Sequence, residues 1–208
     1  LAATASRSVI DQETVMASGK IDPAAIGDAY LAQADHHRHD GTARFTDKLP
    51  ANFLYIGHIA RALPDAKIVC LRRSPMDTVW SNYKNLFASQ SAYYAYSYDL
   101  LDTARYYARF DRLMAMWDKV FPGLVLQLSY EQLVADQEEQ TRRLLEHCGL
   151  DWDEACLTFH ENSAAVATPS AAQVRRPINA DAVGRWRTHE AALQPARAFF
   201  EEQGIPIE

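Results

Sequence analysis

Cysteine is scarce in this 208-residue sequence, which has three cysteines and no CxxC pair. This scarcity excludes a small domain held together by disulfides. We expect Cys70, Cys148 and Cys156 to be buried thiols in a reducing, cytoplasmic compartment. Long apolar runs are also absent, since no stretch reaches the roughly 18 residues of a membrane-spanning helix. We therefore expect no membrane span.

A surplus of basic residues is the second absence. The chain has 21 lysines and arginines against 27 aspartates and glutamates, so its formal net charge is −6. Proteins that bind nucleic-acid duplexes usually carry a basic surplus, so we expect no nucleic-acid partner, although net charge does not exclude a local basic pocket. Metal ligands are sparse as well. His36, His37 and His39 have no cysteine or carboxylate at a suitable spacing, and no metal site is expected.

The residues that are present suit a globular α/β fold. Hydrophobic residues make up 48% of the chain and aromatic residues 11%, which is enough for a core. Apolar runs of strand length occupy 66–71 and 124–128, and 45–49 is a shorter extended candidate. The pattern predicts one parallel sheet flanked by helices. The expected helices lie at about 22–34, 52–63, 76–87, 99–120, 130–148, 151–160 and 189–203.

Polar side chains follow each of the three expected strands. Thr46–Lys48, Leu71–Ser74 and Leu128–Tyr130 bring an ammonium, two guanidiniums, hydroxyls and a phenol to the strand ends. The carboxyl ends of parallel strands meet at one edge of the sheet, where open α/β folds bind ligands. Arginine binds phosphate oxygens through its planar fork and tyrosine can contact a base. This edge therefore suits an anionic ligand that carries a ring.

The spacing of Arg73 and Ser81 adds a geometric argument. Arg73 comes directly after a strand, and Ser81 lies eight residues later, two turns into the following helix. Both side chains can reach one phosphate group there, and the amide groups at the helix N-terminus would assist them. The sequence therefore predicts a phosphate-binding site at this strand end.

The segment Arg73–Ser81 has the pattern Arg-x-Pro-x-Asp-x-x-x-Ser after a strand. It resembles the 3′-phosphate-binding motif of sulfotransferases that use 3′-phosphoadenosine 5′-phosphosulfate (PAPS). The order of the motifs is most similar to bacterial sulfotransferases associated with tetratricopeptide repeats, which are related to tyrosylprotein sulfotransferases. A sulfotransferase fold like that of P-loop NTPases is implied. Further matching segments are Asp47–Phe53, Leu63–Ile68, Tyr130–Val134, Thr168–Pro177 and Gly184–Trp186.

The resemblance covers roughly residues 45–208, the expected carboxyl-terminal portion of a sulfotransferase domain, after a helical segment 1–44. It implies that Arg73 and Ser81 hold the 3′-phosphate of PAPS, and of the product 3′-phosphoadenosine 5′-phosphate (PAP). Tyr130 would contact the adenine end of the nucleotide. The residues expected to close over the nucleotide are Ser170 and Arg185, fifteen residues apart, and Arg176 of the basic pair Arg175–Arg176.

Lys48 matches the lysine of the family's catalytic segment. The resemblance implies that Lys48 stabilises negative charge on the bridging and leaving oxygens during sulfuryl transfer. No metal is required for this chemistry. The acceptor would be a hydroxyl compound, and a saccharide, a peptide tyrosine and a small phenol all remain open. The tyrosines at positions 93–98 are expected to pack in the core and loops rather than to bind the acceptor.

One part of the family pattern has no match. Members of the family begin with a strand and a loop of glycine and serine or threonine, whose backbone N–H groups cradle the 5′-phosphosulfate. Residues 1–44 contain nothing similar. The catalytic base follows this loop in the tyrosylprotein enzymes, and it is unassigned for the same reason. We expect the chain to be the carboxyl-terminal part of a longer sulfotransferase.

Two other interpretations were weighed against a PAPS-dependent sulfotransferase. One is a catalytically inactive sulfotransferase-like module that binds a nucleotide or a protein, and the presence or absence of the loop upstream would distinguish it. The other is a nucleotide kinase, because its P-loop fold is related. The Arg73–Ser81 spacing and the absence of a Gly-Lys-Ser/Thr loop argue against the kinase.

Overall fold

The computed structural model describes residues 12–35, 44–85, 87, 92–162 and 174–207. The chain divides into two compact units, Leu1–Ala66 and Lys67–Glu208. The division into 1–44 and 45–208 rested on sequence similarity rather than on compactness, and it stays a prediction.

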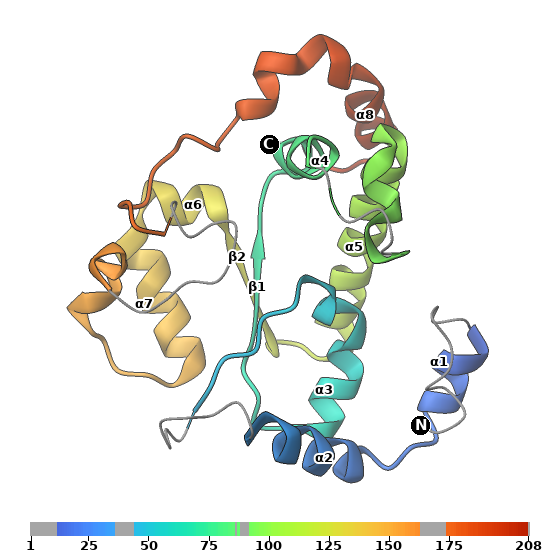
Figure 1. The fold of residues 1–208 in the computed structure, drawn as a ribbon, viewed down its shortest axis with the longest axis vertical. Coiled ribbons are helices and arrows are strands. Elements are labelled where there is room, and N and C mark those ends of the chain that lie inside the picture. The colour runs from blue at the N-terminus through green and yellow to red at the C-terminus, as the bar shows by residue number, and fades with distance from the viewer. Residues whose placement is uncertain (1–11, 36–43, 86, 88–91, 163–173, 208) are drawn as a thin grey trace. The chain divides into compact units, whose positions relative to one another are not determined.

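The regular elements in the described part of the first unit are helices. The predicted helix at 22–34 is confirmed as α2, which begins with Asp22 accepting a hydrogen bond from the amide of Ala24 (3.1 Å). The Ser18 hydroxyl lies 3.2 Å from Nε2 of His58 and so connects two of the helices. The described elements are α1 (Gln12–Ser18), α2 (Pro23–Asp35), η1 (Pro50–Tyr55) and α3 (Ile56–Ala62) (Figure 1).

Gly27 lets α2 lie directly against the end of α3. It is buried, and a Cβ atom at this position would lie only 2.2 Å from the backbone oxygen of Ala62. Such a contact is possible only if one of the helix backbones moves. The absence of a side chain at Gly27 therefore sets how closely the two helices pack.

We expect Gly27→Ala to lower the free energy of unfolding by about 1–3 kcal/mol through this clash. In an open helix position the same substitution would instead stabilise the chain by roughly 1 kcal/mol. Gly19→Ala is the matched control, because its Cβ would meet only the oxygen of Met16 at 3.5 Å, an ordinary contact. Urea unfolding of both variants checks the expectation, and equal stability of the two would contradict it.

The strand predicted at 45–49 is wrong. Residues 44–49 are irregular and exposed, and the segment is tied down by a hydrogen bond of 2.7 Å from the Tyr30 hydroxyl to Asp47. Burial and this bond raise the pKa of Tyr30 to about 12. Only Phe45 and Leu49 are apolar, and 39% and 53% of their surfaces are exposed. The segment thus has too little apolar surface to form a buried strand.

The second unit contains the sheet, and the apolar runs at 66–71 and 124–128 are confirmed as its strands. β1 (Ile68–Arg72) and β2 (Val125–Ser129) pair in parallel, from Ile68 opposite Val125 to Arg72 opposite Ser129. Their carboxyl ends therefore lie side by side, which places the residues after Arg72 next to those after Ser129. The connection between the strands contains α4 and α5 (Figure 1).

Helices flank this sheet, as predicted. α6 and α7 pack on β2, whereas α4, α5 and α8 pack on one another (Figure 1). The longest helix, α5, begins at Asp99, whose side chain accepts from the amide of Asp102, and it matches the prediction at 99–120. The elements are α4 (Pro75–Tyr83), η2 (Ala92–Tyr98), α5 (Leu100–Val120), α6 (Tyr130–Ala135), α7 (Gln137–Cys148), η3 (Glu154–Cys156), η4 (Phe159–Glu161), η5 (Arg185–His189) and α8 (Glu190–Glu202).

Four predicted helices differ from the observed ones. The helix expected at 52–63 is divided into the 3-10 helix η1 and the α-helix α3. The helix expected at 130–148 is two helices, because Asp136 leaves the helical conformation and caps α7 by accepting from the amide of Glu139 (3.1 Å). Its predicted end is confirmed at Gly149, which adopts a left-handed conformation (φ 61°). The helix expected at 151–160 is reduced to η3 and η4, and α4 ends at Tyr83 instead of position 87.

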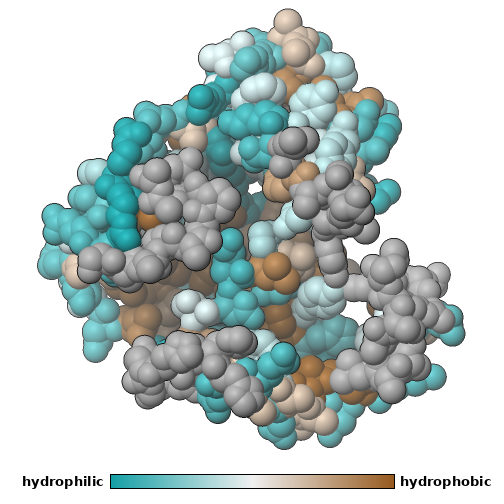
Figure 2. All heavy atoms as spheres, in the orientation of Figure 1, coloured by the Kyte–Doolittle hydropathy of each residue, from teal (hydrophilic) through white to brown (hydrophobic). Residues whose placement is uncertain are grey.

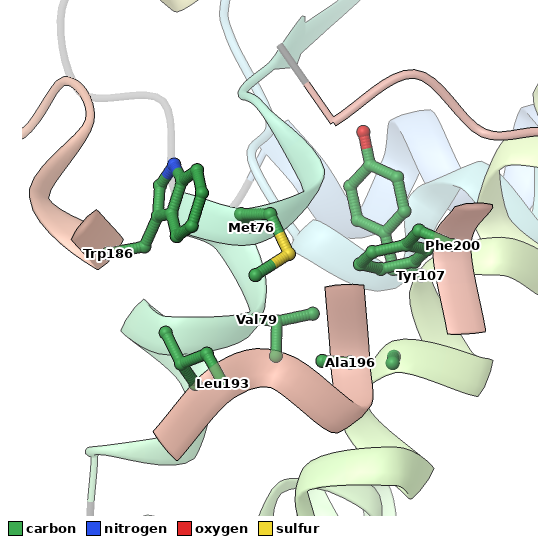
Figure 3. Close-up of a cluster of buried hydrophobic side chains, with 8 residues drawn as sticks. Met76, Val79, Tyr107, Trp186, Leu193, Ala196 and Phe200 are labelled. Carbon is green, nitrogen blue, oxygen red and sulfur yellow. The ribbon is translucent and has the colours of Figure 1, made fainter. Parts of the chain in front are cut away.

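The core of the second unit joins α4, α5 and α8 to a residue of the 3-10 helix η5. Trp186, which is 3% exposed, packs with Met76 and Val79 of α4 (Figure 3). Tyr107 of α5 meets Phe200 of α8 edge to face, with ring centroids 5.6 Å apart. Burying Trp186 in this cluster fixes the loop beside the start of α4, where the strand ends also lie.

Some expectations about burial are not met. Val69 and Leu71 of β1 are 38% and 57% exposed, although the apolar run predicted a strand buried on both faces. Cys70, Cys148 and Cys156 form no disulfide, as expected, but each is only half-buried. The face drawn in Figure 2 is mainly hydrophilic, with hydrophobic residues in small groups between hydrophilic ones. No helix among the described residues is long and apolar enough to cross a membrane.

Candidate functional site

The two arginines at the end of β1 have different surroundings. Arg72 forms an ion pair with Asp111 and donates to the side-chain oxygen of Gln127 (3.0 Å). Burial alone would lower the pKa of Arg72, but its hydrogen bonds to Asp111 and Tyr107 outweigh burial and raise it. The Arg72 guanidinium is therefore occupied inside the fold. The sequence predicted that both arginines could bind a ligand at this edge of the sheet. In the structure Arg72 is bound to Asp111 and Gln127, so Arg73 is the candidate ligand-binding arginine.

Arg73 is held in place at several points but is not fully hydrogen-bonded. Its Nη2 donates to the backbone oxygen of Ala182, and its own backbone oxygen accepts from the Tyr107 hydroxyl (3.1 Å). The guanidinium lies over the ring of Tyr130, 5.4 Å from the centroid. Its Nε is buried and has no hydrogen-bond partner among the described residues. The Arg73 side chain is partly buried, and its Nη2 lies 3.6 Å from the carboxylate of Asp77. A buried donor without an acceptor is costly, so the Nε position favours an anionic ligand.

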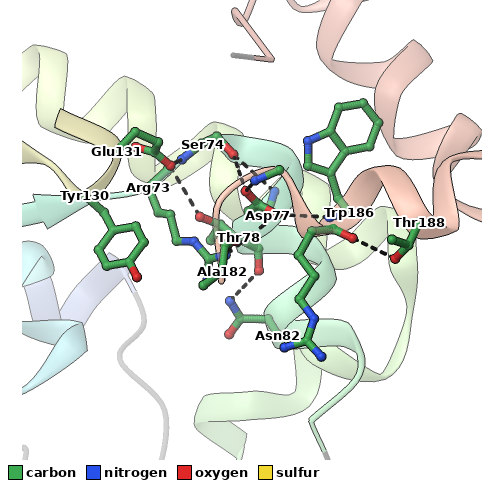
Figure 4. A network of polar contacts seen from close by, with 12 residues as sticks. Arg73, Ser74, Asp77, Thr78, Asn82, Tyr130, Glu131, Ala182, Trp186 and Thr188 are labelled. Carbon is green, nitrogen blue, oxygen red and sulfur yellow. Dashed lines mark hydrogen bonds and ion pairs between the residues drawn. The ribbon is translucent and has the colours of Figure 1, made fainter. Parts of the chain in front are cut away.

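Glu131 fastens the two strand ends to each other. Its carboxylate accepts from the backbone amide of Ser74 (2.8 Å) and from the hydroxyl of Ser129 (2.8 Å). Ser74 in turn caps α4 by accepting from the amide of Asp77. The end of β1, the end of β2 and the start of α4 are thus joined through polar contacts, of which Figure 4 shows those of Glu131 and Asp77 with Ser74. Sequence reasoning noted Glu131 only as part of a motif and gave it no role.

Ser81 lies on α4, three residues after Thr78 and seven after the cap Ser74, so the three share one face of the helix. Its side chain is half-buried and makes no hydrogen bond with any residue that the structure describes. The Thr78 hydroxyl lies 3.4 Å from the backbone oxygen of Arg73, on the same face. Ser81 therefore has a hydroxyl that remains available to a ligand.

Tyr130 helps to hold the segment that follows residue 173 against the strand ends. Its hydroxyl donates to the backbone oxygen of Asn179 (3.3 Å), and Arg73 donates to Ala182 three residues later. The aromatic ring and the guanidinium also contact each other. Tyr130 and Arg73, which the sequence placed on neighbouring strand ends, are therefore brought together as predicted.

Asp77 is the residue that sequence reasoning missed. It is 1% exposed, and its carboxylate accepts from the backbone amides of Gly184 (2.7 Å) and Trp186 (3.0 Å), 107 and 109 residues away (Figure 4). It was visible in the sequence as the acidic residue of the Arg73–Ser81 motif. An acidic residue in the first turn of a helix is ordinarily attributed to the helix dipole, and this masked its role.

The remaining predicted site residues are less enclosed. Arg185 lies between Gly184 and Trp186, and its exposed guanidinium makes no hydrogen bond or ion pair with any described residue. Arg176 is exposed and lies 3.6 Å from Asp181, an ion pair that contributes little at the surface. Lys48 is exposed on the irregular segment of the first unit. Ser170 lies outside the described residues.

Comparisons with known proteins agree with the motifs. A model of the sulfotransferase family matches residues 2–154. A protein of Aquifex aeolicus (strain VF5), described as an uncharacterized protein, is 35% identical over 159 residues, which make up 76% of this chain and 21% of that protein. The chain thus spans about a fifth of the length of this relative. The family match includes residues 2–44, which the resemblance had left out, and it ends before Thr168–Pro177 and Gly184–Trp186.

Proposed function

Because this chain belongs to the sulfotransferase family, we propose that it binds PAPS at the carboxyl end of β1 and serves sulfuryl transfer to a hydroxyl acceptor. PAPS, when bound, supplies the activated sulfuryl group. The chain's own residues bind and orient the nucleotide and balance its negative charge. A saccharide, a peptide and a small molecule are all chemically suitable acceptors.

The observation that carries the proposal is the state of Arg73. Its Nε is a buried cationic donor without a hydrogen-bond partner among the described residues, and it lies at the edge where parallel α/β sheets bind ligands. A phosphate oxygen offers this donor the acceptor that it lacks, and charge-assisted hydrogen bonds to guanidinium are strong. The 3′-phosphate that distinguishes PAPS from ADP and ATP is the group we assign to Arg73.

The other binding residues complete this assignment. Ser81 contributes a hydroxyl from α4, and Arg185 contributes a guanidinium from η5, whose backbone is held by Asp77. Neither side-chain group is bonded to another described residue. Tyr130 supplies an aromatic ring beside Arg73, suited to the adenine end. Ser170 and Arg176 are proposed to close over the nucleotide.

Lys48 is the proposed catalytic residue. Sulfuryl transfer resembles phosphoryl transfer in that positioning and charge stabilisation supply most of the catalysis. An exposed ammonium group without a partner among the described residues is available to balance negative charge on the bridging and leaving oxygens. The proton of the acceptor hydroxyl goes to a base that we leave unassigned.

We place this function in the bacterial cytoplasm. The absence of disulfides between Cys70, Cys148 and Cys156 supports a reducing compartment. The matched relative comes from a bacterium.

Calorimetric titration of the chain with PAP, and with ADP as the control, tests the proposal. We expect PAP to bind at least about 100-fold more tightly, since two charge-assisted hydrogen bonds from Arg73 to the 3′-phosphate contribute roughly 1.5–3 kcal/mol each. Equal affinities for PAP and ADP, or no binding of PAP by a chain shown to be folded, would contradict it.

A further inference from the structure

The buried carboxylate of Asp77 connects two segments that lie more than a hundred residues apart. Its two oxygens accept from the amides of Gly184 and Trp186, and Nη2 of Arg73 lies 3.6 Å from one of them. A buried carboxylate is stable only when hydrogen bonds and an opposite charge compensate for its lost hydration. Asp77 has both, so its carboxylate can hold the segment from Gly184 to Trp186 against the start of α4 (Figure 4).

The backbone around Gly184 is shaped to receive this carboxylate. Gly184 is left-handed (φ 67°, ψ 13°) and the next residues form the η5 turn, so amide groups of the segment point toward one anion. Such a left-handed to right-handed pair of residues is a known anion-binding arrangement of the backbone. Here the anion is a side chain of the same protein, and its effect is to fix the path of the chain from 184 to 186.

Arg185 lies between the two amides that Asp77 binds. Its backbone is therefore held on both sides, while its guanidinium makes no hydrogen bond or ion pair with the described residues. We propose that Asp77 is a positioning residue, which holds Arg185 where its guanidinium meets the 3′-phosphate that Arg73 binds. This inference rests on the proposed function, and it gives the buried aspartate of the motif a role that the binding residues alone do not explain.

The test is the variant Asp77→Asn, whose side chain has nearly the same shape as aspartate. One carboxylate oxygen becomes an NH₂ group, which cannot accept a hydrogen bond from the backbone amide that it faces. PAP affinity is expected to fall about tenfold, whereas ADP, which has no 3′-phosphate, loses less than twofold. In the double variant with Arg185→Ala, the loss is smaller than the product of the two single losses, because Asp77 acts through Arg185. Thr141→Val is the matched control, a buried polar residue of α7 that is expected to leave PAP affinity unchanged.

Gly184→Ala is a second variant, which shifts the backbone that Asp77 binds without altering Asp77 itself. It tests the same proposal if Asp77→Asn does not fold. A side chain at this position is strained by the positive φ and would lie 2.5 Å from the flexible Nη1 of Arg187. The same selective loss of PAP affinity is expected. Independent, multiplicative losses with Arg185→Ala would overturn the positioning role while leaving the proposed function intact. Failure of the unaltered chain to prefer PAP would overturn both.

Discussion

Replacing Arg73 with alanine is expected to weaken PAP binding about 100-fold. Two charge-assisted hydrogen bonds to a phosphate contribute roughly 1.5–3 kcal/mol each, and part of that gain is offset because the wild-type Nη2 must leave the oxygen of Ala182. ADP affinity is expected to change much less, since ADP lacks the 3′-phosphate. Calorimetric titration of Arg73→Ala and of the wild-type chain with PAP and with ADP measures both changes in affinity.

Arg105→Ala is the matched control for this variant. Arg105 is also an arginine of the second unit, but it is about half exposed and pairs with Asp102 three residues earlier in the same helix. Its removal should leave PAP affinity unchanged and stability nearly so. If Arg73→Ala and Arg105→Ala bind PAP equally well, Arg73 is not the phosphate ligand, and the proposed function loses the observation that carries it.

Replacing Lys48 with alanine is expected to reduce turnover of the full-length protein roughly 10²–10³-fold. A single well-placed group that balances developing negative charge contributes an effect of this size. PAP affinity should be nearly unchanged, because the proposed 3′-phosphate ligands are elsewhere in the chain. The measurement is kcat for sulfate transfer from PAPS to a hydroxyl acceptor, together with PAP titration of the same variant.

Lys20→Ala provides the comparison for Lys48. Lys20 is likewise an exposed lysine of the first unit, and it is not part of any matched motif. Turnover should stay at the wild-type level in this variant. Full turnover in Lys48→Ala would remove Lys48 from the catalytic assignment, and an equal loss of PAP affinity and turnover would make it a binding residue instead.

The elements that the sequence predicts correctly are those with local signals. α5 shows this well: Asp99 caps its start, apolar residues recur along one face, and Pro122–Gly123 stops it. The division of the helix at 130–148 also had a local signal, because Asp136 followed three residues later by Glu139 resembles a capping box. The sequence therefore contained the information needed to place the break between α6 and α7 at Asp136.

The prediction of a strand at 45–49 was wrong for a different reason. A helix satisfies its backbone within its own segment, whereas a strand depends on a partner that sequence pattern does not identify. Phe45 and Leu49 are separated by three polar residues, so the segment lacks the alternating apolar pattern of a half-buried strand. The described strands β1 and β2 have longer apolar runs and pair with each other, and α6 and α7 pack on β2.

For the candidate site, the sequence alone determined which groups meet at the strand ends. Arg73 and Tyr130 follow two strands that pair in parallel, and parallel pairing brings such positions together whatever else the fold does. Only the tertiary structure decided between Arg72 and Arg73. Successive side chains of a strand point to opposite faces, and the packing of α5 supplies Asp111 to one of them.

The partners of Asp77 were likewise decided by the tertiary structure. Its position in the first turn of α4 follows from the sequence, but the amides that it binds lie 107 and 109 residues later in the chain. They reach it because Trp186 is buried between α4 and α8. Local pattern predicts what a residue can bind, whereas the path of the folded chain determines which group comes within its reach.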